Sequence, residues 1–300
     1  VAAEELLTRL LPHTGNSVRV GITGVPGVGK STFIEALGLY LVGQGLRVAV
    51  LAVDPSSGIS GGSILGDKTR MPHLAASEQA YIRPSPSAGT LGGVARKTRE
   101  NMLVCEAAGF DVVLVETVGV GQSEVVVSHM TDCFLGLMLP GAGDELQGIK
   151  RGLLELVDVL AVNKADGPTK AAAEYAARQY DIALKTIGSA EDQEVPRVLT
   201  CSALSRQGVD QVWDAIAAHH QRLTDSNRLT QRRRQQELHW LWSIVEERMR
   251  QAVYTHPTVQ AIRPDLEAQI AAGALPAEAA ARRILEAFGL EASPLSSAIP

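Results

Sequence analysis

The chain has 300 residues, enough for two domains of ordinary size or for one large α/β domain with an appendage. Hydrophobic residues make up 45% of the chain and charged residues 20%, which excludes a disordered or fibrous protein. The 28 basic and 33 acidic residues give a net charge of −5, so a surface built to bind nucleic acid is not expected. No run of about 18 apolar residues is present, and we expect no membrane span.

The cysteines and the N-terminal segment indicate the cellular compartment. Cys105, Cys133 and Cys201 are odd in number and far apart, so we expect buried thiols rather than a disulfide framework or a zinc site. Residues 1–11 have the charges of an amphipathic helix and do not resemble a signal peptide. We therefore expect a cytoplasmic protein. Because Val1 is not a methionine, the sequence leaves open a targeting segment removed before it.

Short β-branched runs alternate with longer helical patterns over the first 205 or so residues. The predicted strands are Ser17–Thr23, Arg47–Val53, Ala80–Arg83, Asp111–Glu116, Cys133–Leu139, Val157–Val162 and Val195–Cys201. Helices are predicted over Lys30–Val42, Leu91–Ala108 and Thr169–Lys185. Apolar strands separated by crossover helices predict an α/β fold, a doubly wound and mainly parallel sheet with helices on both faces. Ligands bind such sheets at the carboxyl ends of the strands.

The strands stop near Arg222, and the remainder is helical. We divide the chain into an N-terminal helical segment (1–16), the α/β domain (17–224) and a C-terminal helical arm (225–300). A helix is predicted over Arg228–Gln251, with an apolar stripe of Leu238, Leu241, Val245 and Met249 that is widened by Trp240, Trp242 and Ile244. Two more helices are expected, from Pro264 to Gly273 and from Pro276 to Gly289. Arg232–Arg234 are expected on a solvated helix face.

A phosphate-binding loop lies between the first strand and the first long helix. Its residues match the pattern GxxxxGK[ST]: Gly24, Val25, Pro26, Gly27, Val28, Gly29, Lys30, Ser31 and then Thr32. The glycines let backbone N–H groups surround phosphate oxygens at the positive end of the helix. We expect Lys30 to reach the β- and γ-phosphates and the Ser31 hydroxyl to ligate Mg²⁺. The alternative is a chance glycine-rich turn, which the flanking strand and helix disfavour.

A second motif indicates which base is bound. Asn163, Lys164 and Asp166 form NKxD directly after a predicted strand. The Asp166 carboxylate can accept hydrogen bonds from the ring N–H and the exocyclic amine of guanine, whereas adenine offers no matching donors. Asn163 can bond the guanine edge and brace neighbouring loops, and the Lys164 stem can lie over the ring. The loop of Ser202, Ala203 and Leu204 follows the next strand and can offer a backbone N–H to the guanine carbonyl. The motifs together predict binding of GTP and GDP.

Three acidic residues are expected near the phosphates. Asp54 and Glu116 each end a predicted strand, and Asp67 lies in the segment GDKTR. Carboxylates beside a phosphate loop can hold Mg²⁺, directly or through water, and can position the attacking water. For Asp54 the alternative is a plain turn before Pro55. Gly119 can offer its N–H to the γ-phosphate. No arginine finger or aligned glutamine is evident, so we expect slow intrinsic hydrolysis.

The motifs resemble those of one family. The segments VDPSS, GDKTRM, ETVGVGQSE, PGAGDELQGIKRG, NKAD and CSAL, with the phosphate loop, are similar to those of the methylmalonyl-CoA-mutase-associated GTPases. This family comprises the bacterial MeaB-type proteins and the mitochondrial protein of cobalamin A type methylmalonic aciduria, within the SIMIBI class of P-loop GTPases. Similar sequences were formerly described as LAO/AO transport-system kinases. Glu116 stands where small GTPases carry the Asp of DxxG.

The resemblance implies a function and two kinds of interface. It implies a partner-stimulated GTPase that gates adenosylcobalamin loading of an acyl-CoA mutase, most often methylmalonyl-CoA mutase, and protects that enzyme. It matches Lys30, Ser31, Asp54, Asp67 and Glu116 to the phosphate and Mg²⁺ site, and Asn163 with Asp166 to the base site. It makes the loop with Asp144, Glu145, Gln147 and Lys150 a switch that contacts the mutase. It also implies that the C-terminal arm forms a homodimer, whereas the stripe alone equally fits packing on the parent domain.

Two other functions stay open. A nickel-insertion GTPase usually carries closely spaced Cys and His ligands, which this sequence lacks. A kinase acting on an amino-acid transport system needs a site for a protein hydroxyl, and no motif indicates one. The sequence does not distinguish which acyl-CoA mutase is the partner.

Overall fold

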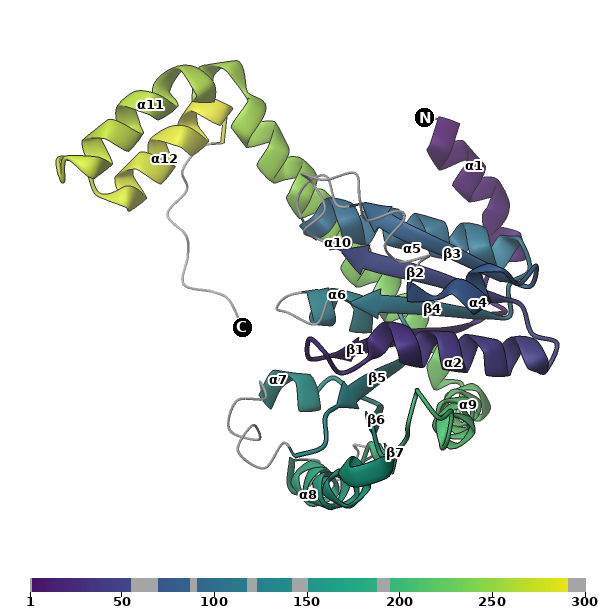
Figure 1. Ribbon diagram of the computed structural model, residues 1–300. Helices are drawn as coiled ribbons and strands as arrows, with labels where there is room; N and C mark the ends of the chain where they lie inside the picture. Colours follow the sequence, from purple (N-terminus) through teal and green to yellow (C-terminus); the bar gives the residue numbers. More distant parts are fainter. Residues whose placement is uncertain are drawn as a thin grey trace. The chain divides into compact units, whose positions relative to one another are not determined.

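A computed structural model describes residues 2–54, 70–86, 91–117, 123–141, 151–187 and 195–290. Within the first of two compact units, Val1–Gln236, these residues form a seven-stranded sheet in the order β3-β2-β4-β1-β5-β6-β7 (Figure 1). Every neighbouring pair runs parallel. The strands are β1 (Val18–Gly24), β2 (Val48–Asp54), β3 (Ala80–Pro86), β4 (Val112–Thr117), β5 (Cys133–Met138), β6 (Val159–Val162) and β7 (Arg197–Thr200). The predicted doubly wound parallel sheet is confirmed, with all seven expected strands.

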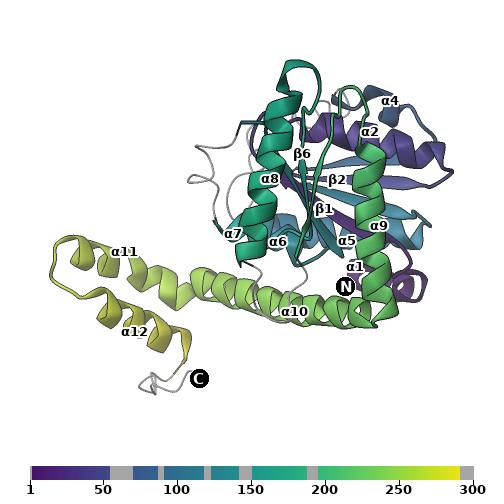
Figure 2. The ribbon, with the colours of Figure 1, turned by 90° about the horizontal axis from the view of Figure 1, so that it is seen from below.

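Helices lie on both sides of this sheet (Figure 2). α2 (Lys30–Gly43) packs on β1 and β2 and against α9 (Val209–Asp225), while α5 (Leu91–Ala107) packs on β2, β3 and β4. Because both faces are covered, most positions of the central strands are apolar rather than alternating, and β5 and β6 are buried at every position. The described residues of this unit also form α1 (Ala2–Leu10), η1 (Leu11–His13), α4 (Pro72–Ala75), α6 (Ser123–Ser128), α7 (Arg151–Leu154), η3 (Gly167–Thr169) and α8 (Lys170–Ile187).

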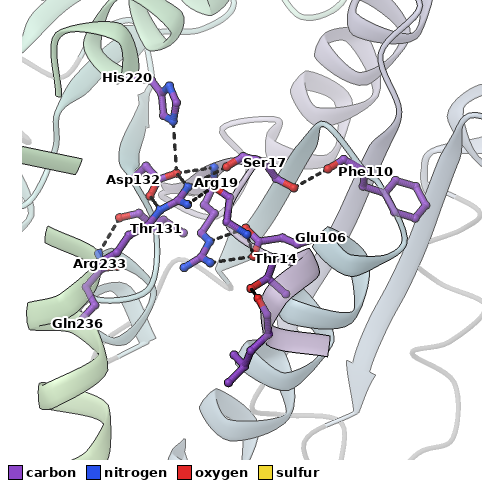
Figure 3. A network of polar contacts seen from close by, with 12 residues as sticks. Thr14, Ser17, Arg19, Glu106, Phe110, Thr131, Asp132, His220, Arg233 and Gln236 are labelled. Atoms are coloured by element: carbon purple, nitrogen blue, oxygen red, sulfur yellow. Dashed lines mark hydrogen bonds and ion pairs between the residues drawn. The ribbon is translucent and has the colours of Figure 1, made fainter. Parts of the chain in front are cut away.

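Two aspartates at the amino edge of the sheet anchor the start of α10 (Arg228–Thr255). Asp132 is fully buried directly before β5 and accepts hydrogen bonds from the Arg19 backbone N–H (2.9 Å) and from the Arg233 guanidinium (2.8 and 2.6 Å; Figure 3). Asp158 directly precedes β6 and is held in the same way by the Phe134 N–H (2.8 Å) and by Arg232 (3.2 and 2.9 Å).

The expectation of a solvated face for this arginine run is therefore wrong for two of its three members. Arg232 and Arg233 are half-buried ion-pair partners, and Arg234 alone is exposed. Figure 3 shows that the network continues through Arg19, whose guanidinium forms two bonds to the buried Glu106 (2.7 and 2.8 Å). A charge run in a sequence does not reveal that buried carboxylates lie opposite it.

The second unit, Glu237–Pro300, continues α10 and adds α11 (Pro257–Ala271) and α12 (Ala277–Phe288). Val259, Leu266 and Ala280 are buried where α11 and α12 pack together. The helix expected to start at Pro264 starts instead at Pro257, and Pro264 lies inside it. The expected ends are confirmed: Gly273 follows α11 and Gly289 caps α12, both with positive φ. None of the helices that the structure describes is long and apolar enough to cross a membrane.

The apolar stripe of α10 is exposed to solvent. Its side chains are between 37% and 62% exposed: Leu238, Leu241, Trp242, Val245 and Met249. They follow spacings of three and four residues and therefore form one face of the helix. Each large apolar side chain exposed in this way loses the stabilisation that burial would give.

Candidate guanine-nucleotide site

The phosphate loop joins β1 to α2 at the centre of the sheet's carboxyl edge. Two of its glycines are required by geometry. Gly24 has φ +154°, and a Cβ there would lie 2.5 Å from the Leu137 carbonyl oxygen of the neighbouring strand. Gly29 has φ +92° as the residue before α2, a left-handed conformation that side chains disfavour. The apolar Val28 between them is fully buried. The backbone of the loop therefore requires glycine at both positions.

Lys30 is the first residue of α2, and its ammonium folds back over the loop. Its Nζ donates a 2.6 Å hydrogen bond to the Gly24 carbonyl. Burial lowers the pKa of Lys30, and the Glu116 and Glu124 carboxylates act in the opposite direction. The ammonium therefore lies at the loop that would hold the phosphates, close enough to two carboxylates to interact with them.

The Ser31 hydroxyl and the Glu116 carboxylate converge beside the loop. Ser31 Oγ, in the first turn of α2, donates to Glu116 Oε1 near the end of β4 at 3.3 Å. Asp54 ends β2, which is hydrogen-bonded to β4 with Ala52 opposite Glu116, so its backbone reaches the same edge. A hydroxyl and carboxylates are the oxygen ligands that Mg²⁺ prefers, so these residues fit that ion. Asp67 and Gly119 lie outside the described residues.

Asn163 links the phosphate loop to the segment after β7. Its side-chain Nδ2 donates to the Val28 carbonyl (2.8 Å), and its Oδ1 accepts from the Ala203 N–H (2.9 Å). The residue is only 2% exposed. The structure thus favours the bracing role over direct contact with the base, because both amide atoms are already engaged.

The rest of the NKxD motif lies beside this brace. Lys164 has φ +62°, and its Nζ donates to the Gly27 carbonyl (2.7 Å), so its stem spans from the motif to the phosphate loop. Asp166 directly precedes η3 and is half-buried. The Thr169 hydroxyl ties this turn together by donating to the Lys164 and Asp166 carbonyls (2.5 and 2.8 Å). Asp166 thus follows the carboxyl end of β6, the end of the strand at which the sequence predicts the base site.

The segment after β7 forms a closed turn. Ser202 N–H donates to the Gln207 carbonyl (2.9 Å), and the Ser202 hydroxyl accepts from the Ser205 N–H (3.2 Å). Leu204 stands at the tip with its side chain 81% exposed. The structure therefore brings this turn, the NKxD motif and the phosphate loop together through described hydrogen bonds.

Glu124 was not predicted as part of the site. It lies in α6, is nearly buried, and accepts from the Thr23 hydroxyl (3.3 Å) next to the phosphate loop. The sequence offered one signal, an acidic residue at the end of ETVGVGQSE. The predicted partner loop with Asp144, Glu145, Gln147 and Lys150 lies outside the described residues.

A second cluster of metal-ligating types lies at the amino edge, away from these motifs. Ligand atoms of Cys133, Asp158 and His219 lie within 4.8 Å of one another. Asp158 is already bonded by the Arg232 guanidinium and by the Phe134 N–H. We interpret the cluster as part of the anchor of α10, because a cation there would compete with Arg232 for the carboxylate.

A phosphate loop after β1 and an NKxD motif after β6, at the same edge of the sheet, are the arrangement of a P-loop GTPase. The sequence profile of the family described as methylmalonyl Co-A mutase-associated GTPase MeaB matches residues 1–258. The chain belongs to the MeaB family. The resemblance expected from the motifs is thereby confirmed, and as a MeaB-family protein the chain is a GTPase.

The relatives of this MeaB-family chain extend over most of its length. A protein of Caulobacter vibrioides named putative GTPase is 58% identical over 291 residues, covering 97% of this chain and 89% of its own. The mouse methylmalonic aciduria type A homolog, mitochondrial, is 45% identical over 270 residues, covering 90% and 65%. A crystal structure described as an LAO/AO transport system kinase superposes with a TM-score of 0.75 at 41% identity, covering 94% of this chain and 85% of its own.

Proposed function

We propose that the chain is a guanine-nucleotide switch that gates adenosylcobalamin loading of an acyl-CoA mutase, with methylmalonyl-CoA mutase as the first candidate, and that it protects that enzyme. The observation that carries the proposal is the Asn163 brace, which joins the phosphate loop and the base motif into one site. Membership of the MeaB family supports the mutase as partner.

Within this proposal, Lys30 binds the β- and γ-phosphates, exchanging the Gly24 carbonyl for phosphate oxygens. Ser31, Asp54, Asp67 and Glu116 would hold Mg²⁺, which would neutralise charge on the phosphates. Glu116, already in contact with Ser31, orients the attacking water through its carboxylate. Asp166 accepts from guanine, Lys164 lies over the ring, and the turn of Ser202, Ala203 and Leu204 donates to the guanine carbonyl. Intrinsic hydrolysis is slow and is stimulated by the partner.

Base selectivity is tested by titration with labelled GDP and ADP. We expect the wild-type chain to prefer GDP strongly and Asp166→Ala to lose most of that preference. Asp214→Ala on α9, distant from the motif in sequence, serves as the matched control. If the wild-type chain bound GDP and ADP with equal affinity and Asp166→Ala left both affinities unchanged, the assignment of a guanine-specific site would be refuted.

The partner is tested by measuring GTP hydrolysis with and without methylmalonyl-CoA mutase. We propose that the loop of Asp144, Glu145, Gln147 and Lys150 contacts the mutase and responds to the nucleotide. Lys150→Ala should then reduce the stimulated rate and leave the basal rate unchanged. Stimulation that survives this change would place the contact elsewhere. No stimulation of the wild-type chain by either methylmalonyl-CoA or isobutyryl-CoA mutase would refute the mutase as partner.

We also propose a homodimer formed through the C-terminal arm. The exposed stripe on α10, with Trp242 at 62% exposure, supports this interface because two such faces would bury each other. Sedimentation of the full chain should show a dimer that Leu238→Asp with Trp242→Asp converts to a monomer. Gln251→Asp on the same helix should leave the dimer intact. A double variant that remains dimeric would exclude the stripe.

A kinase acting on a transport protein is the second candidate, because the crystal structure that superposes at 41% identity is described as a transport system kinase. Transfer of labelled γ-phosphate to a purified amino-acid-binding protein would support that function. Release of the label as inorganic phosphate alone would support the switch.

A further inference from the structure

The buried thiol of Cys201 lies against the brace of the proposed guanine site. Its Sγ is 3.8 Å from Asn163 Oδ1, within the range of a sulfur hydrogen bond, and the residue is 2% exposed. Its backbone is engaged on the same side: the Cys201 N–H donates to Val162, and its carbonyl accepts from the Ala165 N–H (both 2.9 Å). Cys201 therefore contacts the NKxD turn through both its main chain and its side chain.

The contacts of Asn163 have a fixed direction. Its Nδ2 must face the Val28 carbonyl, which accepts, and its Oδ1 must face the Ala203 N–H, which donates. A rotated amide would set oxygen against oxygen and nitrogen against N–H, losing both bonds. An S–H group donates, so Cys201 favours the same orientation as Ala203.

The Cys201 thiol must be protonated to donate a hydrogen bond to Asn163 Oδ1. Burial raises the pKa of Cys201 to about 12, so the S–H form persists at neutral and mildly alkaline pH. A thiolate would instead face the amide oxygen with a negative charge. The high pKa and the burial also make the thiol a poor nucleophile, so a role in chemistry is not indicated.

We propose that Cys201 is a positioning residue for guanine recognition: its S–H group orients the Asn163 amide, which in turn fixes the NKxD turn against the phosphate loop. The proposal rests on the proposed guanine-nucleotide binding and adds a specific donor to it. An S–H donor is weak, so we expect its contribution at the lower end of that of a neutral hydrogen bond.

The test compares Cys201→Val, which keeps an apolar side chain but has no donor, with Cys201→Ser, which keeps a donor. We expect Cys201→Val to weaken GDP binding roughly 2- to 10-fold, with Cys201→Ser within about twofold of the wild-type chain. The affinity ratio of GDP to ADP should fall in the valine variant and recover in the serine variant. Cys105→Val on α5 is the control, a buried cysteine on another element.

The outcomes separate the inference from the function on which it rests. A wild-type chain that does not bind GDP refutes the proposed function. Wild-type binding with an unchanged Cys201→Val affinity overturns the positioning role. Equal losses in Cys201→Val and Cys201→Ser, with an unchanged GDP to ADP ratio, also overturn it, because packing and not the donor would then matter. If Cys201→Val does not fold, Cys201→Ala against Cys201→Ser makes the same comparison.

Discussion

Removing the Asn163 side chain tests whether the site is held together as the structure indicates. Asn163→Ala deletes the 2.8 Å bond to the Val28 carbonyl and the 2.9 Å bond from the Ala203 N–H. A neutral hydrogen bond contributes about 0.5–1.5 kcal/mol net, so the pair contributes about 1–3 kcal/mol. If this energy pre-organises the two loops for nucleotide, the dissociation constant of GDP should rise about 5- to 150-fold.

Equilibrium titration with fluorescent GDP measures this change. Urea unfolding in the absence of nucleotide separates a loss of loop organisation from a loss of the whole fold. Asn101→Ala on α5 provides a matched control, a half-buried asparagine on a helix that packs against β2, β3 and β4. A dissociation constant within about twofold of the wild-type value, together with a normal unfolding curve, would falsify the bracing role.

Three further changes have defined outcomes. Gly24→Ala should lower the free energy of unfolding by about 1–3 kcal/mol and weaken GDP binding, because the new Cβ would lie 2.5 Å from the Leu137 carbonyl oxygen. A Cβ at Gly43 would meet no atom within 4 Å, so Gly43→Ala should change neither the unfolding free energy nor GDP binding by much. Arg233→Met should cost about 3–5 kcal/mol in urea unfolding, because it leaves the Asp132 carboxylate buried without its main cation, and adding Asp132→Asn should recover part of that loss. Burial lowers the pKa of His220, so the imidazole binds a proton less readily in the folded chain than in the unfolded chain. The free energy of unfolding should therefore fall as the pH drops below about 6.5. His220→Gln should flatten this part of the curve of unfolding free energy against pH.

Much of the nucleotide site could be predicted because its motifs specify backbone geometry locally. The backbone of the phosphate loop requires glycine at Gly24 and Gly29, and the spacing of these glycines can be recognised in the sequence alone. The strands were predictable for a related reason: runs buried on both faces are apolar throughout, as in β5. The positions of Asp166 and Ser202 followed from the rule that ligand sites lie at the carboxyl ends of parallel strands.

Contacts between elements could not be predicted in the same way. The bond from Asn163 to Val28 joins residues 135 positions apart, and the ion pair of Arg233 with Asp132 joins residues 101 apart. The pattern of a sequence carries no register between such distant segments. Glu124 was missed for this reason, since only the folded chain places it beside Thr23.

Helix boundaries were predicted less well where the local signal was ambiguous. Pro257 and Pro264 both suit a first helical turn by composition, and the structure starts α11 at the earlier one. α9 was not predicted, although Val209, Val212 and Ile216 have helical spacing and are buried.

Asp132 and Asp158, which form ion pairs with the start of α10, directly precede β5 and β6. At their other ends, β5 leads towards the predicted partner loop and β6 leads into the NKxD motif. At about 3.3 Å per residue, the six residues of β5 separate its two ends by roughly 20 Å of buried backbone. Substitutions that remodel one end need not disturb packing at the other. A lineage could therefore exchange everything beyond Gln236 for a different helical module while inheriting the same nucleotide site, provided that Arg232 and Arg233 were kept.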